Sequence, residues 1–206
     1  MDFYSYDVYI FDFDGTLVLS NEIKEEAFYF CANNFLDGRA IMKSIKESFY
    51  NKDRYTIFTA FIKHYYQDKS VFENEYKAIL TKYKKYTINQ IINAEPVPGS
   101  IDVLKNLRVN NKKIFVNSAT PLDSLKQSVE GRGLDIYFDR CFGMESNKSK
   151  NILEIARITS ANLNSIIMIG DGLDDKEAAD HLSVSFFPVG KLLSGRPPSF
   201  LNLVKS

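Results

Sequence analysis

Proline and glycine are scarce in the first half of this 206-residue sequence. All six prolines lie at or beyond Pro96, and Gly38 is the only glycine between Thr16 and Pro98. Because these residues are the strongest interrupters of regular structure, their scarcity argues against closely spaced turns and favours helices. We therefore expect residues 18–94 to be all-helical. The amphipathic pattern predicts helices at about residues 21–34, 38–49, 53–67 and 70–85. Ser70 and Glu73 form a capping-box pattern at the start of the last of these helices.

Beyond Pro96 the pattern changes, and strands and helices are expected to alternate. Pro98 and Gly99 precede a helix that should run to Val109, after which apolar strand segments and amphipathic segments follow one another. Such alternation predicts a parallel sheet with right-handed crossovers. The predicted fold is α/β, with a Rossmann-like parallel sheet core formed by residues 1–17 and 95–206 and helices on both faces. Residues 18–94 form an inserted all-helical block.

An excess of charge of one sign, abundant cysteine and long apolar runs are also missing. Twenty-six basic residues balance 26 acidic ones, so we expect no basic surface for nucleic acid. No apolar run approaches the roughly 18 residues that span a bilayer, and the N-terminal residues do not resemble a signal peptide. Only Cys31 and Cys141 are present, which suits a reduced cytoplasm and a role in packing. The expectation is a cytoplasmic protein without membrane partners, of unknown oligomeric state.

Two carboxylates follow the first apolar segment. Residues 8–11, Val-Tyr-Ile-Phe, predict a buried strand, and Asp12-Phe13-Asp14-Gly15-Thr16 comes directly after it. In extended backbone the side chains at i and i+2 point to the same side, which places Asp12 and Asp14 together. Two such anions raise each other's pKa unless a cation or hydrogen-bond donors compensate. The alternative is an ordinary Asp-Gly turn at the end of a strand.

A second acidic cluster follows another apolar segment. Residues 165–170 predict a buried strand that runs into Asp171-Gly172-Leu173-Asp174-Asp175, before a helical stretch from Lys176 to Leu182. Ligands bind at the carboxyl ends of the strands in open parallel sheets, so the two acidic clusters can meet at one edge. Carboxylate oxygens are suitable ligands for Mg²⁺.

Two weaker signals lie between these clusters. The predicted strand 112–117 ends in Ser118-Ala119-Thr120-Pro121, where Thr120 is expected to be the N-cap and Pro121 the first helical residue. A helix N-terminus together with a serine hydroxyl can bind phosphate oxygens, although local capping is the more frequent role. The segment Asn147-Lys148-Ser149-Lys150 precedes another helical pattern. A lysine there can enter a site, although most such lysines are solvated.

The order of these four elements resembles that of the haloacid dehalogenase-like superfamily over essentially the whole chain. Residues 12–16 are similar to its first motif, Ser118 to its second and Lys148 to its third. Gly170-Asp171 followed by Asp174-Asp175 is similar to the fourth. The helical insert resembles the cap of the phosphoglycolate phosphatase-like members.

The resemblance implies roles for the acidic residues. Asp12 would be the nucleophile and Asp14 the general acid and base. Asp12, Asp14, Asp171 and Asp175 would hold Mg²⁺. We prefer Asp175 to Asp174, because the sequence from Asp175 onward is similar to the family's usual continuation into a helix.

The resemblance also implies which residues contact the substrate. Lys148 would act on the transferring phosphate; Lys150 is the alternative, because the proline that often follows the family lysine is missing here. Arg54, between two predicted cap helices, would contact a remote part of the substrate, and a solvated arginine is the alternative reading. His64 and His181 lie in no motif, and we expect no chemistry from them. The residues expected at the phosphate are Thr16, Ser118, Ala119 and Lys148.

The predicted function is that of a magnesium-dependent phosphoric monoester hydrolase. It would hydrolyse a small phosphorylated metabolite, such as a sugar phosphate, through an aspartyl-phosphate intermediate. A sugar phosphomutase would use the same residues and is the main alternative. A non-enzymatic phospho-accepting signalling domain would share the sheet, but it would not explain Asp14 or the insert. A dehalogenase would need neither Asp14 nor a metal.

Overall fold

The computed structural model describes residues 2–50 and 52–204, and the chain divides into two compact units. The first unit comprises residues 1–20 and 92–206, and the second comprises residues 21–91. Each unit has its own hydrophobic core. Among the described residues, no helix is both long enough and apolar enough to cross a membrane.

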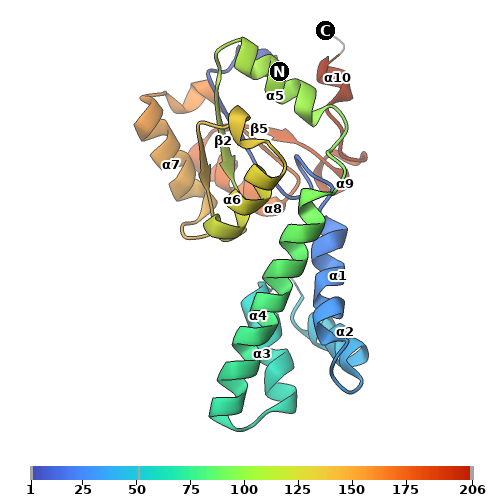
Figure 1. Ribbon diagram of the computed structural model, residues 1–206. Coiled ribbons are helices and arrows are strands. Elements are labelled where there is room, and N and C mark those ends of the chain that lie inside the picture. The colour runs from blue at the N-terminus through green and yellow to red at the C-terminus, as the bar shows by residue number, and fades with distance from the viewer. Residues whose placement is uncertain (1, 51, 205–206) are drawn as a thin grey trace. The chain divides into compact units, whose positions relative to one another are not determined.

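A parallel five-stranded sheet forms the centre of the first unit (Figure 1). This confirms the predicted α/β class. The strand order is β3-β2-β1-β4-β5, so β1 is central and pairs with both β2 and β4. The chain fills one side of β1 and then crosses to the other side with β4. Ligands bind in open parallel sheets at such a switch in strand order, beyond the carboxyl ends of the strands. The strands are β1 (Val8–Phe11), β2 (Lys113–Asn117), β3 (Arg140–Phe142), β4 (Ile166–Gly170) and β5 (Ser185–Pro188).

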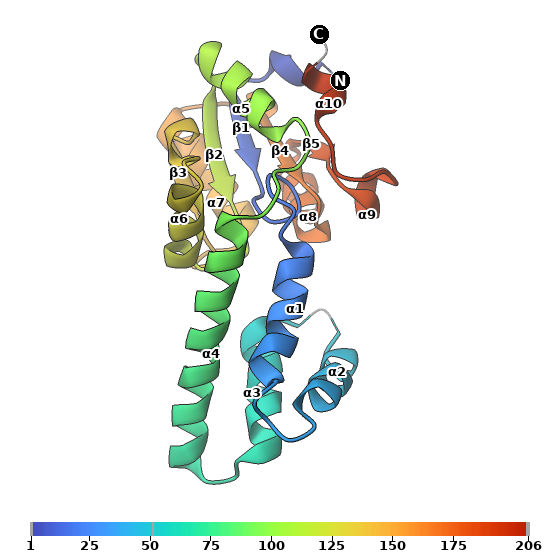
Figure 2. The same cartoon turned by 45° about the vertical axis from the view of Figure 1, so that its right-hand side comes forward.

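Helices lie on both faces of this sheet (Figure 2). Helices α7 and α8 pack on the face that carries Val8 and Ile10, through apolar residues such as Ile155 and Ala179. On the other face, the ring of Phe11 packs on that of Phe200. The helices of this unit are α5 (Ser100–Val109), α6 (Leu122–Gly131), α7 (Lys148–Thr159), α8 (Leu173–Leu182), α9 (Lys191–Ser194) and α10 (Leu201–Val204), with 3₁₀ turns at Phe3–Ser5, Asp135–Tyr137 and Leu163–Ser165.

Two predicted helix starts in this unit are wrong. Pro121 is the N-cap of α6 in place of Thr120, and the helix begins at Leu122. The Thr120 hydroxyl is not used as a cap because it bonds to Asp14, far away in the sequence. Helix α8 begins at Leu173, three residues before the predicted Lys176, because residue 175 caps its first turn.

The second unit consists of four helices around an aromatic core. Phe28, Phe58 and Tyr83 pack on one another with ring centroids 5.0 to 5.4 Å apart. Phe58 and Phe61 are fully buried. Such packing holds together a small helical unit whose individual helices would be marginal alone. The helices are α1 (Asn21–Ala32), α2 (Gly38–Ser48), α3 (Arg54–Tyr65) and α4 (Lys69–Ile92).

Helix α4 differs from its prediction at both ends. The predicted capping box of Ser70 and Glu73 does not form. Instead, Asp68 accepts hydrogen bonds from the backbone N–H groups of Ser70 and Val71, at 2.9 and 3.1 Å. The helix also continues seven residues past Lys85, because no glycine or proline stops it and Ile91 is buried.

The chain leaves and re-enters the first unit through two linkers that pair with each other. The backbone N–H of Leu19 donates to Glu95 O, and that of Val97 donates to Leu17 O, both at 3.0 Å. Val18 and Pro96 form an antiparallel bridge between these segments. The two linkers therefore form a short antiparallel ladder on the sheet unit.

Both cysteines are free thiols. Burial raises the pKa of the Cys31 thiol to about 12 and that of Cys141 to about 11. A thiol in that state is a poor nucleophile at neutral pH. The predicted role in packing fits Cys31, which is fully buried in the helical core.

Candidate active site

Asp12 lies at the carboxyl end of the central strand. Its backbone N–H still donates to Ile169 O of β4, at 2.8 Å, so the sheet fixes its position. Phe13 is buried and anchors the segment by packing. Only 5% of Asp12 is exposed. The strand thus delivers a rigidly held and almost completely buried carboxylate to the switch in strand order.

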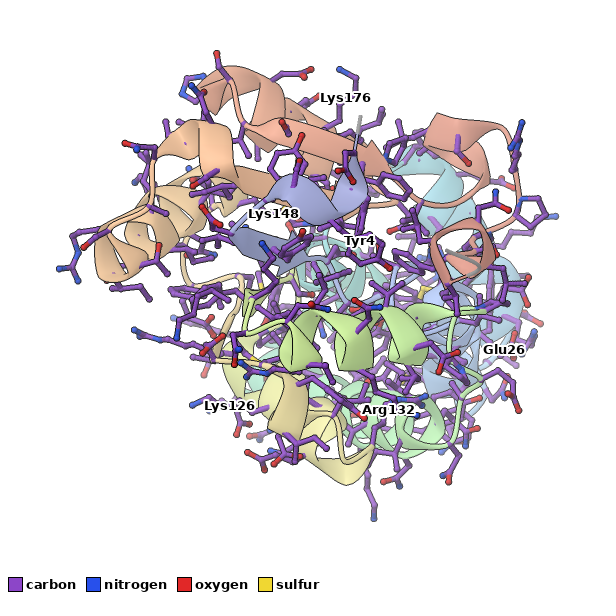
Figure 3. All side chains as sticks on the ribbon, turned by 90° about the horizontal axis from the view of Figure 1, so that it is seen from above. Tyr4, Glu26, Lys126, Arg132, Lys148 and Lys176 are labelled. Carbon is purple, nitrogen blue, oxygen red and sulfur yellow. The ribbon has the colours of Figure 1, made fainter. Side chains whose placement is uncertain are left out.

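Lys148, which is labelled in Figure 3, is the first residue of α7 and contacts three carboxylates. Its Nζ lies 3.2 Å from Asp12 Oδ1 and 2.9 Å from Asp174 Oδ2, and it also contacts Asp175 Oδ1. Burial by itself lowers the pKa of the ammonium group. The charges of the three carboxylates outweigh burial, so the net effect raises the pKa above its usual value. Lys148 is therefore a permanent cation beside Asp12.

Three carboxylates gather at the edge shared by β1 and β4. One oxygen each of Asp12, Asp171 and Asp175 lies within 4.8 Å of the others. Burial raises the pKa of Asp12 well above its usual range; Lys148 opposes this, and the other acids reinforce it. Burial likewise raises the pKa of Asp175 to about 6.

The donor set fits a divalent cation. Lys148 opposes but does not cancel the effects of burial and of the neighbouring acids, so the pKa values of Asp12 and Asp175 stay raised. A second cation would favour the charged forms of these carboxyl groups. Three hard oxygen ligands at this spacing suit Mg²⁺.

Local backbone features hold Asp171 and Asp175 in place. The hydroxyl of Thr16 donates to Asp171 Oδ1 at 3.2 Å, which links the first acidic loop to the second. Asp175 Oδ2 accepts from the Gly172 N–H at 3.1 Å and caps the first turn of α8. A Cβ atom at Gly170 would overlap the Asp175 side chain, so only glycine allows this close approach. The position of Asp175 therefore requires glycine at residue 170.

Two hydroxyl groups hold the carboxylate of Asp14. Ser20 Oγ donates to Oδ1 at 2.7 Å, and Thr120 Oγ1 donates to Oδ2 at 3.0 Å. The charge of Asp14 contributes to the raised pKa of Asp12, so the two carboxylates are close enough to interact. Neither hydroxyl was assigned this role from the sequence. A buried serine that ends the first linker and a threonine two positions after Ser118 are weak signals on their own.

Ser118 lies at the end of β2 on the same edge of the sheet. Its N–H donates to Phe142 O at 3.0 Å, and its Oγ accepts from the Thr120 N–H at 3.2 Å. Ser118 is buried, whereas Ala119 is exposed. The β2–α6 loop thus supplies a fixed hydroxyl and a turn of backbone at the carboxyl edge.

A buried pair of asparagines supports Lys148 and was not predicted. Asn117 Nδ2 donates to the Lys148 carbonyl at 3.1 Å. Asn151 Nδ2 donates to Asn117 Oδ1 at 2.9 Å and to Gly143 O at 3.1 Å. These bonds tie the end of β2 to the loop and first turn that carry Lys148. The available signal was a polar residue at the end of an otherwise apolar strand and another within an apolar helix pattern.

The remaining candidate residues are more exposed or belong to the helical unit. The side chain of Asp174 is 55% exposed, whereas that of Asp175 is fully buried. Lys150 is exposed, and its backbone N–H donates to Asn147 Oδ1. Arg54 belongs to the second unit, where its guanidinium lies 5.4 Å from the centroid of the Tyr83 ring. Its contact with a substrate stays a prediction.

Comparison with known proteins gives one family and many similar folds. The model of a family described as haloacid dehalogenase-like hydrolase matches residues 9–189. A candidate β-phosphoglucomutase from Thermotoga maritima has a similar structure, with 17% identity, a TM-score of 0.74 and coverage of 97% of this chain and 98% of that one. A candidate hydrolase of this class, YfnB from Bacillus subtilis, was solved with magnesium bound; it shows 15% identity, a TM-score of 0.71 and coverage of 98% and 99%.

A candidate phosphatase from Clostridium difficile is 21% identical, with a TM-score of 0.67 and coverage of 98% of this chain and 91% of that one. At these identities the structures establish a shared fold. A search of curated proteins found no match.

Proposed function

Because the chain belongs to the haloacid dehalogenase-like hydrolase family, we propose that it is a magnesium-dependent phosphatase acting on a small phosphorylated metabolite. The reaction would be hydrolysis of a phosphoric monoester through an aspartyl-phosphate intermediate. One observation carries the proposal: the buried Asp12 carboxylate lies 3.2 Å from the Lys148 ammonium, beside Asp171 and Asp175. An acidic nucleophile next to a permanent cation suits the transfer of an anionic phosphoryl group.

The metal would be held by the carboxylates of Asp12, Asp171 and Asp175, together with the backbone carbonyl of Asp14. When bound, Mg²⁺ supplies positive charge that offsets the repulsion between the Asp12 carboxylate and the phosphate. The exposed Asp174 would instead serve as a partner of Lys148. This assignment keeps Asp175 as the ligand preferred from the sequence.

The first half-reaction would be carried out by Asp12 and Asp14. An Asp12 oxygen attacks phosphorus, the bond from phosphorus to the ester oxygen breaks, and Asp14 gives its proton to the departing alkoxide. Lys148 and the Ser118 hydroxyl, with backbone N–H groups of the loop through Ala119, hold the oxygens of the transferring group. The product is an alcohol and a phosphorylated Asp12.

The second half-reaction would regenerate the enzyme. Asp14, now ionised, takes a proton from water, and the hydroxide attacks the phosphorus of the aspartyl phosphate. Inorganic phosphate leaves and the Asp12 carboxylate is restored. The hydroxyls of Ser20 and Thr120 suit this exchange, because a hydroxyl can donate to the ionised carboxylate and accept from the protonated one.

A sugar phosphomutase is the second candidate, since it would use the same residues and return the phosphoryl group to another hydroxyl. Product analysis separates the two. A phosphatase releases inorganic phosphate in proportion to substrate consumed, whereas a mutase gives an isomeric phosphate ester. A signalling domain that only accepts phosphate would need neither an acid at Asp14 nor turnover.

The first test is hydrolysis of a small aryl phosphate by the purified protein with and without Mg²⁺. We expect turnover that depends on Mg²⁺ and is abolished by a chelator. A screen of phosphorylated metabolites, with sugar phosphates foremost, then identifies the substrate. Lack of hydrolysis of every ester with Mg²⁺ present would contradict the proposal.

Two lysines give a matched comparison within α7. Lys148→Ala should impair hydrolysis of every substrate, because it removes the cation beside Asp12. Lys150→Ala should change little, since that side chain is exposed and lies in the same helical turn. Equal loss in both variants would contradict the assignment of Lys148.

A further inference from the structure

Two loops of the sheet unit lie next to each other at the carboxyl edge, because the strands before them, β2 and β3, are paired in parallel (Figure 2). The loop after β2 begins with Ser118, and the loop after β3 leads to Lys148, the first residue of α7. Both side chains are expected to hold oxygens of the transferring phosphoryl group. The bonds between the two loops therefore set the position of the Ser118 hydroxyl relative to the Lys148 ammonium group.

Two buried amide side chains join these loops from within the protein. Asn117 is fully buried, and only 5% of Asn151 is exposed. Asn117, which directly precedes Ser118, donates to the Lys148 carbonyl at 3.1 Å. Asn151, in the first turn of α7, donates both to Asn117 Oδ1 and to Gly143 O, at 2.9 and 3.1 Å. Because buried polar groups cost free energy unless they are paired, these amides favour the one arrangement of the loops in which their bonds are made.

Further bonds join the same loops at the surface. The Met144 N–H donates to Thr120 O at 3.1 Å. Glu145 Oε1 accepts from the N–H of Leu122, the first residue of α6, at 2.8 Å. A Cβ atom at Gly143 would lie 2.5 Å from Leu122 N, so glycine allows this close approach. The Glu145 carboxylate also lies at the positive end of the α6 dipole, which favours its charge. The two loops are thus bonded to each other on the buried side and on the exposed side.

One of these bonds leads to the proposed general acid. The carbonyl of Thr120 is held by Met144, and the hydroxyl of Thr120 donates to Asp14 Oδ2 at 3.0 Å. A shift of the loop after β3 would therefore be passed on to Thr120 and to the carboxylate of Asp14. The arrangement of the two loops thus bears on proton transfer as well as on the groups that hold the phosphate.

We propose that Asn117, Asn151 and Glu145 are positioning residues for phosphoryl transfer. Together they form an inter-loop network that makes the two loops one rigid body, and so fixes the hydroxyl of Ser118 relative to the ammonium group of Lys148. None of the three would contact the substrate, since they act through the groups that they hold. This inference rests on the phosphatase function proposed above.

The rigidity of the two loops matters most in the transition state. The oxygens of the phosphoryl group spread apart as phosphorus becomes five-coordinate, and fixed donors that match this geometry lower the barrier. A misplacement of about 1 Å can cost roughly 100-fold in rate. The ground state needs a less exact fit, so loosening the loops should lower kcat and weaken a transition-state mimic more than it raises KM. A residue that only stabilised the fold would not separate these quantities.

The experiment compares two anions that bind at the position of the phosphate. Orthovanadate becomes five-coordinate there and imitates the transition state, whereas inorganic phosphate stays tetrahedral. Their inhibition constants are measured together with kcat and KM for phenyl phosphate, using the purified protein with Mg²⁺. The variants are Asn151→Ala, Glu145→Ala and Glu145→Gln. Ser128→Ala is the control, because it removes a buried hydroxyl whose bond to Ser124 O, at 3.0 Å, lies within α6.

We expect Asn151→Ala to lower kcat on phenyl phosphate roughly 10- to 100-fold, with KM changed by less than about threefold. The inhibition constant of orthovanadate should rise by a similar factor, and that of inorganic phosphate should change little. Glu145→Ala should lower kcat less, because only one exposed bond is lost. Glu145→Gln should keep most of the wild-type kcat, since its amide oxygen still accepts from the Leu122 N–H. Ser128→Ala should change none of these constants.

Three results would overturn the inference. They are an unchanged kcat in Asn151→Ala, equal weakening of both anions, or the same losses in Ser128→Ala. Thermal melts check that each variant is folded. If Asn151→Ala does not fold, the Glu145 variants decide, because this side chain is exposed and its replacement should not prevent folding. Equal kcat in Glu145→Ala and Glu145→Gln would then overturn the inference. If the wild-type protein hydrolyses no ester at all, the phosphatase function itself is wrong, and that outcome is distinct from failure of the inter-loop network alone.

Discussion

The two units of the chain bury different kinds of side chain. In the unit that contains the sheet, the buried residues include Asp12, Asp14, Asp175 and the asparagine pair at Lys148. In the helical unit, Thr87 is the only buried polar residue among those the structure describes, and the rest of its core is apolar. Burying polar groups costs free energy unless each has a partner. The sheet unit therefore carries arrangements that stability alone does not require, and the helical unit carries almost none.

This difference shows in which unit the buried side chains indicate a functional site. Polar groups buried together at a sheet edge indicate a functional site, because stability alone would favour apolar residues at these positions. In the helical unit, function must lie on exposed or half-buried side chains such as Arg54, which packing does not single out.

The largest effect should come from the nucleophile. Asp12→Asn keeps the shape of the side chain but cannot form the acyl phosphate, so turnover should fall by roughly 10⁴-fold or more, the scale seen when a nucleophile is removed. Mass spectrometry of the quenched wild-type reaction should find phosphate on Asp12, and circular dichroism should show the variant folded. Retained turnover would exclude Asp12 as the nucleophile.

The next effect separates proton transfer from metal binding. Asp14→Asn keeps the backbone carbonyl but removes the acid, so kcat should fall by roughly 10² to 10⁴ while Mg²⁺ affinity changes little. Asp171→Ala should instead raise the Mg²⁺ concentration needed for half-maximal activity. Titration of both variants with Mg²⁺ distinguishes the two losses. If both variants simply lose the metal, the assigned division of roles is wrong.

A pair of core substitutions tests how separate the two units are. Phe58→Ala in the helical core should cost about 3 to 5 kcal/mol of unfolding free energy, and Ile155→Ala beneath the sheet about 2 to 5 kcal/mol. Because the clusters do not share residues, each change should speed amide hydrogen exchange mainly in its own unit. Equal loss of protection in both units after either change would show that they unfold together.

A functional role for the helical unit would appear as a change in substrate preference. Arg54→Ala should raise KM for the true substrate roughly 10-fold, consistent with the loss of one charged hydrogen bond, and should affect a small aryl phosphate much less. Lys63→Ala, an exposed cation on the same helix, is the control. Equal effects on both substrates, or none, would make Arg54 a surface residue.

The smallest effect concerns the cap of α3. Asp53 accepts from the N–H groups of Tyr55 and Thr56, which lowers its pKa. Asp53→Ala should cost about 1 kcal/mol of unfolding free energy at neutral pH, and Asp53→Asn should cost less. A lowered pKa means that the contribution of the charge is present above the unfolded pKa of about 3.9 and is lost as the pH falls through the folded value. Chemical denaturation at several pH values measures this contribution. If the difference in unfolding free energy between the wild-type protein and the variants does not shrink in acid, the role of the charge is contradicted.

Most of the fold could be predicted, because its signals are local. Apolar runs located β1, β2 and β4, and the scarcity of glycine and proline located the helical unit. The errors arose where a short polar side chain had several possible partners. Thr120 looked like a helix cap, yet its hydroxyl bonds to Asp14, 106 positions away. Ser70 looked like a cap, yet Asp68, two residues earlier, accepts from the N–H groups of Ser70 and Val71 and caps the helix instead.

In the candidate site, too, some residues have local sequence signals and others do not. Lys148 and the acidic residues stand directly after strands or at a helix start, so their gathering follows from strand order. Asn117 and Asn151 act through bonds to residues far along the chain, and nothing in their local sequence reveals a partner. Such supporting residues depend on the tertiary structure.

The ladder between the two linkers suggests that the helical unit is exchangeable. Its ends leave the sheet unit from paired segments, at Leu17 to Leu19 and Glu95 to Val97, so closing the chain there requires no rearrangement of the sheet. Doubling the length of a loop costs only about 0.6 kcal/mol in closure entropy, so inserts of very different size are tolerated at this point. A short turn or a foreign helical bundle could be grafted between the same two segments.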